Sequence, residues 1–111
     1  MVKYRVEYEH LVFSVSEDLT LLNISEFVEV FERAIEETQV YQIILEAHNI
    51  SMADSSGIGM LISQYKRLKE KGGSITLVGA RAGLLETLRI TRLDQFLMPM
   101  TDLEKALNKN K

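Results

Sequence analysis

The chain has 111 residues, 46% of them hydrophobic, and this size and composition predict a single compact domain over residues 1–111. Cysteine is absent, which excludes disulfides, thiolate catalysis and cysteine-ligated metal sites and fits a reducing compartment. The formal net charge of -3 argues against a general affinity for nucleic acids or acidic membranes, because phosphate binding depends on clustered lysine and arginine. The first residues interleave charged and apolar side chains, and no long apolar run follows, so we expect neither a leader peptide nor a membrane span and predict a cytoplasmic protein.

The first half of the chain predicts a β-hairpin followed by a helix. Residues 3–9 alternate strictly between apolar and charged side chains, which is typical of a half-buried strand, and we expect it at a sheet edge. Residues 10–17 continue the alternation as a second arm, although the turn between the arms has no strong sequence signal. From Asn23 onward apolar residues recur three and four positions apart, which predicts an amphipathic helix. We expect Asn23 and Glu26 to form a capping box at its start.

The second half predicts a strand–helix–strand unit. Residues 40–45 and 74–78 are short apolar runs typical of buried strands, and the segment between them predicts a helix over about 56–71 that ends at Gly72. Short connections make the two strands parallel with a right-handed crossover. The loop over residues 48–55 therefore lies at the carboxyl end of a strand, where α/β proteins usually build their sites.

The last third of the chain predicts two further helices. One covers about residues 82–90, and an apolar run over residues 96–100 follows it. A final helix is expected to open with a capping box of Thr101 and Glu104. Strands and helices thus alternate along the whole chain, which indicates an α/β fold.

A distinctive motif, Asp-Ser-Ser-Gly-Ile-Gly, stands at the start of the predicted central helix. Asp54 or Ser55 occupies the N-cap position, so one side chain satisfies an unpaired backbone N–H of the helix. Capping explains one of these groups and leaves the second hydroxyl unexplained. Gly57 and Gly59 each disfavour a helix by about 1 kcal/mol relative to alanine, which suggests a close approach to the backbone. A helix amino end also favours anions, so a phosphate on one serine is compatible with the fold, and the loop is a candidate switch.

Enzyme and metal chemistry find little support in the sequence. The glycines do not form a dinucleotide-binding fingerprint, and neither a Walker lysine nor a nucleophile elbow is present. His10 and His48 are the only imidazoles and lie far apart in sequence. We therefore predict no catalytic residues, no metal site and no cofactor. The predicted central helix ends in a group of cations that favour the helix dipole: Lys66, Arg67, Lys69 and Lys71.

The motif and its surroundings resemble a known family. The stretch ADSSGIGMLISQYKRLKEKGGSITLVGA, followed by LLETLRITRLDQFL, closely resembles the STAS domain and specifically the bacterial anti-sigma-factor antagonists. The D-S-S-G-x-G motif, a basic helix ending in G-G and an apolar strand are specific when they occur in this order. The resemblance implies a small mixed β-sheet of about four to five strands, with about four helices packed mostly on one face.

The resemblance also implies a partner-switching function. In the family, the unphosphorylated antagonist binds an anti-sigma factor that is also a serine kinase, and this releases a sigma factor that activates transcription. The kinase phosphorylates the serine before the glycine, which corresponds to Ser56, with Ser55 as the less favoured neighbour, and a serine phosphatase reverses the reaction. A phosphate beside Asp54 would repel the partner without unfolding the protein. The implied partner-binding residues are Asp54, Ser55, Ser56, Gly57, Ile58, Gly59 and Met60.

Two departures from the family pattern leave alternatives open. Many members carry a Gly-acidic-Leu-Asp turn before the first helix, where this chain has SEDLTLLN with Glu17 and Asp18 only loosely in place. The family's later Thr-Gly-Leu is Thr91-Arg92-Leu93 here. One alternative is a non-switching STAS scaffold, as in a stressosome or a lipid-transport complex. Another is an enzyme or nucleotide-binding protein that uses the same loop, so weak nucleotide binding stays open.

Overall fold

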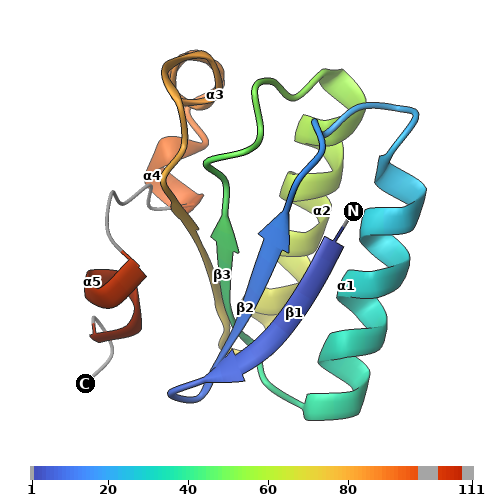
Figure 1. Cartoon of the computed structure of the whole chain (residues 1–111), viewed down its shortest axis with the longest axis vertical. Coiled ribbons are helices and arrows are strands. Elements are labelled where there is room, and N and C mark those ends of the chain that lie inside the picture. Colours follow the sequence, from blue (N-terminus) through green and yellow to red (C-terminus); the bar gives the residue numbers. More distant parts are fainter. Residues whose placement is uncertain (1, 98–102, 109–111) are drawn as a thin grey trace.

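A four-stranded mixed sheet forms the centre of the computed structural model, which describes residues 2–97 and 103–108. Its strands follow the order β1 (Val2–Glu7), β2 (His10–Val15), β3 (Gln42–Glu46) and β4 (Ser74–Val78) (Figure 1). β1 is antiparallel to β2, whereas β2, β3 and β4 are mutually parallel. The expected hairpin, the edge position of the first strand and the strand–helix–strand unit are confirmed.

Five helices accompany the sheet in the described part of the chain. They are α1 (Ile24–Thr38), α2 (Ser55–Glu70), α3 (Ala82–Ile90), α4 (Asp94–Leu97) and α5 (Leu103–Asn108). α1 and α2 lie side by side behind the sheet, and α5 lies away from them on the other side (Figure 1). The first two residues of the predicted apolar run belong to the short helix α4, which the sequence did not suggest. The rest of that run and Thr101, the expected cap of the last helix, lie outside the described residues.

The main core fills the space between the sheet and the first four helices. Because side chains alternate between the faces of a strand, Leu11, Phe13 and Val15 of β2 all point toward α1 and α2. Phe13 stacks on Phe31 with 4.8 Å between ring centroids, and Phe27 lies 5.4 Å from Phe31. Such aromatic pairs add about 1 kcal/mol each to the burial of their surface, so this stack fixes α1 on the sheet.

The opposite face of the sheet carries a smaller core under α5. Val12, Ile44 and Val78 come from three adjacent strands and pack against Ala106 and Leu107 of α5. These five residues are all buried. The expectation that the helices pack mostly on one face is therefore confirmed, with α5 as the helix on the other face.

The hairpin turn between β1 and β2 consists of Tyr8 and Glu9, and both have positive φ, 47° and 65°. Two-residue turns with this backbone match the twist of a hairpin and normally use asparagine and glycine. His10 Nδ1 donates a hydrogen bond to the Tyr8 carbonyl, with 2.8 Å between the two atoms. The turn is thus built without the residues that usually mark it, which explains its weak sequence signal.

Replacing Glu9 by glycine is expected to raise the free energy of unfolding by about 1 kcal/mol, because the left-handed conformation carries no Cβ penalty in glycine. Urea unfolding followed by circular dichroism measures the change. The matched control is Glu29→Gly in the middle of α1, where the same substitution should lower stability by about 1 kcal/mol. A loss of stability in Glu9→Gly would contradict the turn geometry.

The start of α1 differs from the expected capping box. Asn23 has helical backbone angles, φ -112° and ψ -16°, and its side chain makes no capping hydrogen bond. Instead, its Nδ2 donates to the carbonyl of Asp18 at 3.0 Å. The N–H groups of Asn23 and Ile24 both donate to the carbonyl of Thr20, at 2.9 and 3.0 Å, so a backbone turn leads into the helix. The capping-box prediction was wrong because the asparagine side chain bonds to the loop five residues earlier instead of to the helix.

The end of α2 follows the prediction. Gly72 adopts the left-handed conformation, with φ 72°. Its N–H donates to the Lys69 carbonyl at 3.0 Å, and the next N–H, that of Gly73, donates to Leu68 at 2.7 Å. This pair of backbone hydrogen bonds is the Schellman motif, which satisfies the last carbonyls of a helix.

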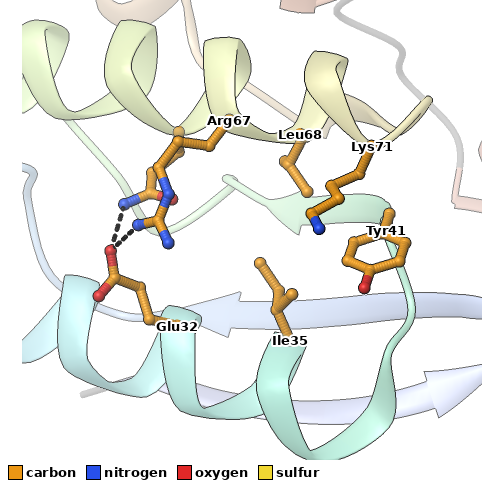
Figure 2. A pocket seen from close by; sticks show the side chains of 7 residues that line it. Glu32, Ile35, Tyr41, Arg67, Leu68 and Lys71 are labelled. Atoms are coloured by element: carbon orange, nitrogen blue, oxygen red, sulfur yellow. Dashed lines mark hydrogen bonds and ion pairs between the residues drawn. The ribbon is translucent and has the colours of Figure 1, made fainter.

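Two cations at the C-terminal end of α2, Arg67 and the C-cap residue Lys71, also contact neighbouring elements. Arg67 forms an ion pair with Glu32 of α1, and the Lys71 ammonium lies 6.0 Å from the centroid of the Tyr41 ring. Figure 2 shows these groups around a small groove between α1 and α2, with Ile35 and Leu68 as its apolar floor. The polar groups at this groove thus interact with one another, and these interactions hold the two helices together.

Candidate functional site

The loops that follow the three parallel strands meet at one edge of the sheet, next to the amino end of α2 (Figure 1). The loop after β2 and the loop after β3 pair through a short parallel bridge between Leu19 and Ala53. The Leu19 N–H donates to the Met52 carbonyl at 3.1 Å, and the Asp54 N–H donates to the Leu19 carbonyl at 3.0 Å. The candidate site is built on these two paired loops.

Two aspartates bind the loops to each other in both directions. Asp18, from the first loop, accepts the N–H groups of Ser51 and Met52 on one carboxylate oxygen, at 2.6 and 3.2 Å. Asp54, from the second loop, accepts the N–H of Leu21 at 3.0 Å. Bonds from charged carboxylates are stronger than neutral ones, so the two loops form one fixed unit. The sequence did not assign a role to Asp18, because its partners lie more than thirty residues away.

Asp54 is also the N-cap of α2. Its backbone is extended, with φ -84° and ψ -175°, and its Oδ1 accepts the N–H of Gly57 at 2.9 Å. The hydrogen bonds from Gly57 and Leu21 lower the pKa of the Asp54 carboxyl below its ordinary value of 3.8. Of the two expected capping candidates, Asp54 and Ser55, the structure selects the aspartate. A negative charge therefore already occupies the amino end of the helix.

The lowered pKa of Asp54 predicts a pH dependence of stability. A carboxylate with a lower pKa in the folded state stabilises the fold above its unfolded pKa, and this contribution is lost as the pH falls through the folded value. Asp54→Asn keeps a capping side chain without the charge. The difference in free energy of unfolding between wild type and Asp54→Asn should be constant above about pH 5 and shrink below about pH 4. Urea titrations across this range measure it.

The control for this experiment is Glu29→Gln, which removes an exposed carboxylate of α1 and leaves the loops unchanged. A difference between wild type and Asp54→Asn that stays constant down to about pH 3 would contradict the role of the Asp54 charge.

Both serine hydroxyls are left unused by the fold. Ser55 is exposed and Ser56 is partly exposed in the first turn of α2. Neither hydroxyl has a hydrogen-bond partner among the described residues, because Asp54 supplies the cap. Because the cap is Asp54 rather than Ser55, neither hydroxyl is needed for capping, and both are accessible for chemistry.

The two glycines of the motif have different surroundings. A Cβ at Gly57 would lie 2.1 Å from the carbonyl oxygen of Leu19, so the close approach expected from the sequence is made by the protein's own loop. A Cβ at Gly59 would meet nothing within 4 Å, and Gly59 is exposed. The fold therefore requires the glycine at 57, and nothing within the chain requires the one at 59.

The residues expected to contact a partner divide into a surface group and a buried group. Ser55 and Gly59 are exposed, and Asp54, Ser56 and Ile58 are partly exposed. Gly57 is covered by Leu19, and Met60 is only 6% exposed within the main core. Met60 faces the sheet because it follows Gly57 by three residues, on the same side of the helix. A contact through the Met60 side chain is therefore not available.

Three exposed apolar side chains beside the motif were missed. Leu21 is 69% exposed, Leu22 is 91% exposed and Met52 is 48% exposed. All three belong to the paired loops, and no surface role was predicted for them from the sequence. The available signal was two adjacent leucines outside the three-and-four spacing of α1. We define the α2 N-terminal surface as Leu21, Leu22, Met52, Asp54, Ser55, Ser56 and Gly59.

Other kinds of site find no support in the described part of the chain. No group of three or more potential metal-ligating side chains occurs within residues 2–97 and 103–108. Over the same ranges, none of the helices combines the length and the apolar character that a membrane crossing needs. His48 is exposed after β3, whereas His10 is buried beside the hairpin turn.

A family model for the STAS domain matches residues 1–107, and the chain belongs to this family. The family resemblance suggested by the motif is therefore confirmed. An anti-sigma F factor antagonist from Paenibacillus polymyxa is 30% identical over 73 residues, which are 66% of this chain. The match spans 62% of that relative's length.

Solved structures share the fold at lower sequence identity. The structure of the Bacillus cell fate determinant SpoIIAA in its phosphorylated form is 20% identical, with a TM-score of 0.76 over 100% of both chains. A sulfate transporter family protein from Wolinella succinogenes is 18% identical, with a TM-score of 0.78 over 95% of this chain and 87% of that one. These likenesses support the fold and leave the function to be argued from the site.

Proposed function

We propose that this protein is an anti-sigma factor antagonist that binds an anti-sigma factor through the α2 N-terminal surface while Ser56 is unphosphorylated. The observation that carries the proposal is the pair of unbonded serine hydroxyls on a rigid, apolar-rimmed helix start. The name of the Paenibacillus polymyxa relative and the phosphorylated state of the SpoIIAA structure support it. Binding of the anti-sigma factor would release a sigma factor and activate transcription.

Electrostatics explains how phosphorylation would switch the surface. A phosphate adds about -1.5 to -2 charges, and the Asp54 carboxylate already takes up the favourable position at the helix amino end. The phosphate on Ser56 would therefore stand beside a like charge. The Leu21 N–H donates to Asp54, two residues before Ser56, so a partner that covers this exposed leucine would also have to remove water from the phosphate. Binding would be lost while the fold, held by Asp18 and Asp54, stays intact.

The proposed partners follow from this chemistry. The kinase is the anti-sigma factor itself, and a serine phosphatase restores the binding form. The protein acts by binding rather than by catalysis, in the cytoplasm, and we propose no direct contact with nucleic acid.

The apolar rim gives a prediction of its own. Leu22→Asp should weaken binding to the anti-sigma factor by at least about tenfold, because an exposed apolar contact becomes a buried charge. The free energy of unfolding should change by less than about 0.5 kcal/mol, since Leu22 is 91% exposed. The matched control is Ile90→Asp at the end of α3, also exposed, which should bind like wild type. Equal binding by both variants would show that Leu22 is not part of the binding surface.

The modification site is tested by incubating the protein with ATP and an anti-sigma kinase encoded near it. Mass spectrometry then locates any phosphate in wild type, Ser55→Ala and Ser56→Ala. We expect phosphate on wild type and Ser55→Ala and none on Ser56→Ala. Phosphate on Ser55 alone would move the switch by one residue. Stable binding to other proteins without any phosphorylation would favour the non-switching scaffold.

A further inference from the structure

A second hollow lies between α2 and α4, away from the motif. It has a volume of about 290 Å³ and is lined by Ile62, Tyr65, Lys66, Leu93, Phe96 and Leu97. Phe96 is 46% exposed, and its ring centroid lies 5.4 Å from that of Tyr65. The protein buries Phe13, Phe27 and Phe31 almost completely, so a phenylalanine exposed at an apolar hollow is the exception.

This hollow is separate from the α2 N-terminal surface. Tyr65 follows Ser56 by nine residues, which is two and a half helical turns and about 13 Å along the axis. Tyr65 and Ser56 therefore lie on opposite sides of α2. Ile62 and Lys66 share the side of Ser55 and Gly59 but lie seven residues, or about 10 Å, further along the helix. The hollow also differs from the groove between α1 and α2, where the ion pair of Glu32 with Arg67 already occupies the polar edge (Figure 2).

Cations gather around the hollow. Lys66 lines it, Lys69 follows one turn later on the same helix, and Arg92 directly precedes Leu93. None of these three cations forms an ion pair with another residue of the described ranges, whereas the following arginines do: Arg5, Arg33, Arg67 and Arg89.

The local charge is opposite to that of the whole chain. Residues 62–71 and 89–97 contain six Lys or Arg and two Asp or Glu, in a chain whose net charge is -3. A concave apolar surface beside unpaired cations is complementary to apolar side chains flanked by carboxylates.

We propose that this hollow is a second docking surface that receives an acidic amphipathic helix of a protein partner. Apolar side chains at helical spacing would fill the hollow that Tyr65 and Phe96 line. Carboxylates on the flanks of that helix would pair with Lys66, Lys69 and Arg92. The hollow lies further along α2 than Ser56, so one protein can hold a second partner there while the α2 N-terminal surface is switched.

The probe is a synthetic helix of about 18 residues, with leucine at positions i, i+3, i+4 and i+7 and glutamate at most other positions. A second peptide has lysine in place of every glutamate. We expect the acidic peptide to bind saturably, at least about tenfold tighter than the basic one, and more weakly as salt rises. Amide NMR shifts should move at Ile62, Tyr65, Leu93 and Phe96.

Two charge-reversed variants separate this site from general attraction. The double variant Lys66→Glu/Lys69→Glu should bind the acidic peptide at least about tenfold more weakly than wild type. The double variant Lys3→Glu/Lys105→Glu, with the same change in net charge, should bind it like wild type. All four lysines are exposed, and urea unfolding confirms that both variants fold. Ser56→Asp should bind the peptide like wild type, so this proposal and the switch fail separately. The proposal would be overturned if both peptides bind equally or if the acidic peptide does not saturate below about 1 mM. It would also be overturned if both lysine variants lose the same affinity, or if the NMR shifts are confined to other residues.

Discussion

Gly57→Ala is expected to lower the free energy of unfolding by about 3 kcal/mol, the largest stability effect of the substitutions considered. The added Cβ would lie 2.1 Å from the Leu19 oxygen and 2.8 Å from the Leu19 carbonyl carbon, and both are backbone atoms that a rotamer change cannot move. The loop after β2 would have to separate from α2. This movement would stretch the hydrogen bonds by which Asp54 holds Leu19 and Leu21.

The same substitution two residues later should have the opposite sign. Gly59→Ala meets no atom within 4 Å, and alanine favours a helix over glycine by about 1 kcal/mol, so this variant should be more stable than wild type. Urea unfolding of both variants measures the pair. Equal destabilisation by the two substitutions would contradict the packing of Leu19 on α2. In a binding experiment, the Gly59→Ala variant should bind the anti-sigma factor more weakly than wild type despite its higher stability, because the added methyl group lies on the proposed contact surface.

Elements with a clear apolar period could be predicted from the sequence. The alternation in β1 and the helical spacing in α1 and α2 report burial on one side, whereas β2 is buried on both faces because α5 covers Val12. The short helix α4 carried too few residues for a period to show. The turn at Tyr8 and Glu9 was hidden because residues other than glycine adopt its left-handed backbone.

The motif could be located from the sequence, but its internal roles could not. The capping position was limited to two residues, and the choice of Asp54 depends on a backbone geometry that only the folded loops determine. The close approach inferred for Gly57 was correct, yet its origin in Leu19 lies thirty-eight residues earlier in the chain. The pairing of Asp18 with Ser51 is of the same long-range kind, and no local pattern signals it.

Phosphorylation of Ser56 is expected to weaken binding to the anti-sigma factor by at least about a hundredfold, or about 2.7 kcal/mol. The effect requires no change of fold. The new charge stands beside the Asp54 carboxylate, whose pKa is already lowered by two backbone N–H groups and which therefore stays ionised at neutral pH. A partner that closes over Leu21 and Leu22 would have to remove water from both charges, and this desolvation is unfavourable.

Two variants bracket this effect. Ser56→Asp carries about half the charge of a phosphate and should lose most of the binding, whereas Ser56→Ala should bind like the unphosphorylated protein whether or not ATP is present. Ser55→Asp adds the same charge one residue earlier, on the more exposed serine, and shows how strictly the position matters.

The affinity of the purified anti-sigma kinase for this protein, measured by calorimetry before and after stoichiometric phosphorylation, tests the central claim most directly. The account predicts a loss of at least about a hundredfold on phosphorylation, together with an unchanged circular dichroism spectrum and urea midpoint. Equal affinity of the two forms, or a loss that accompanies unfolding, would contradict a switch at the α2 N-terminal surface.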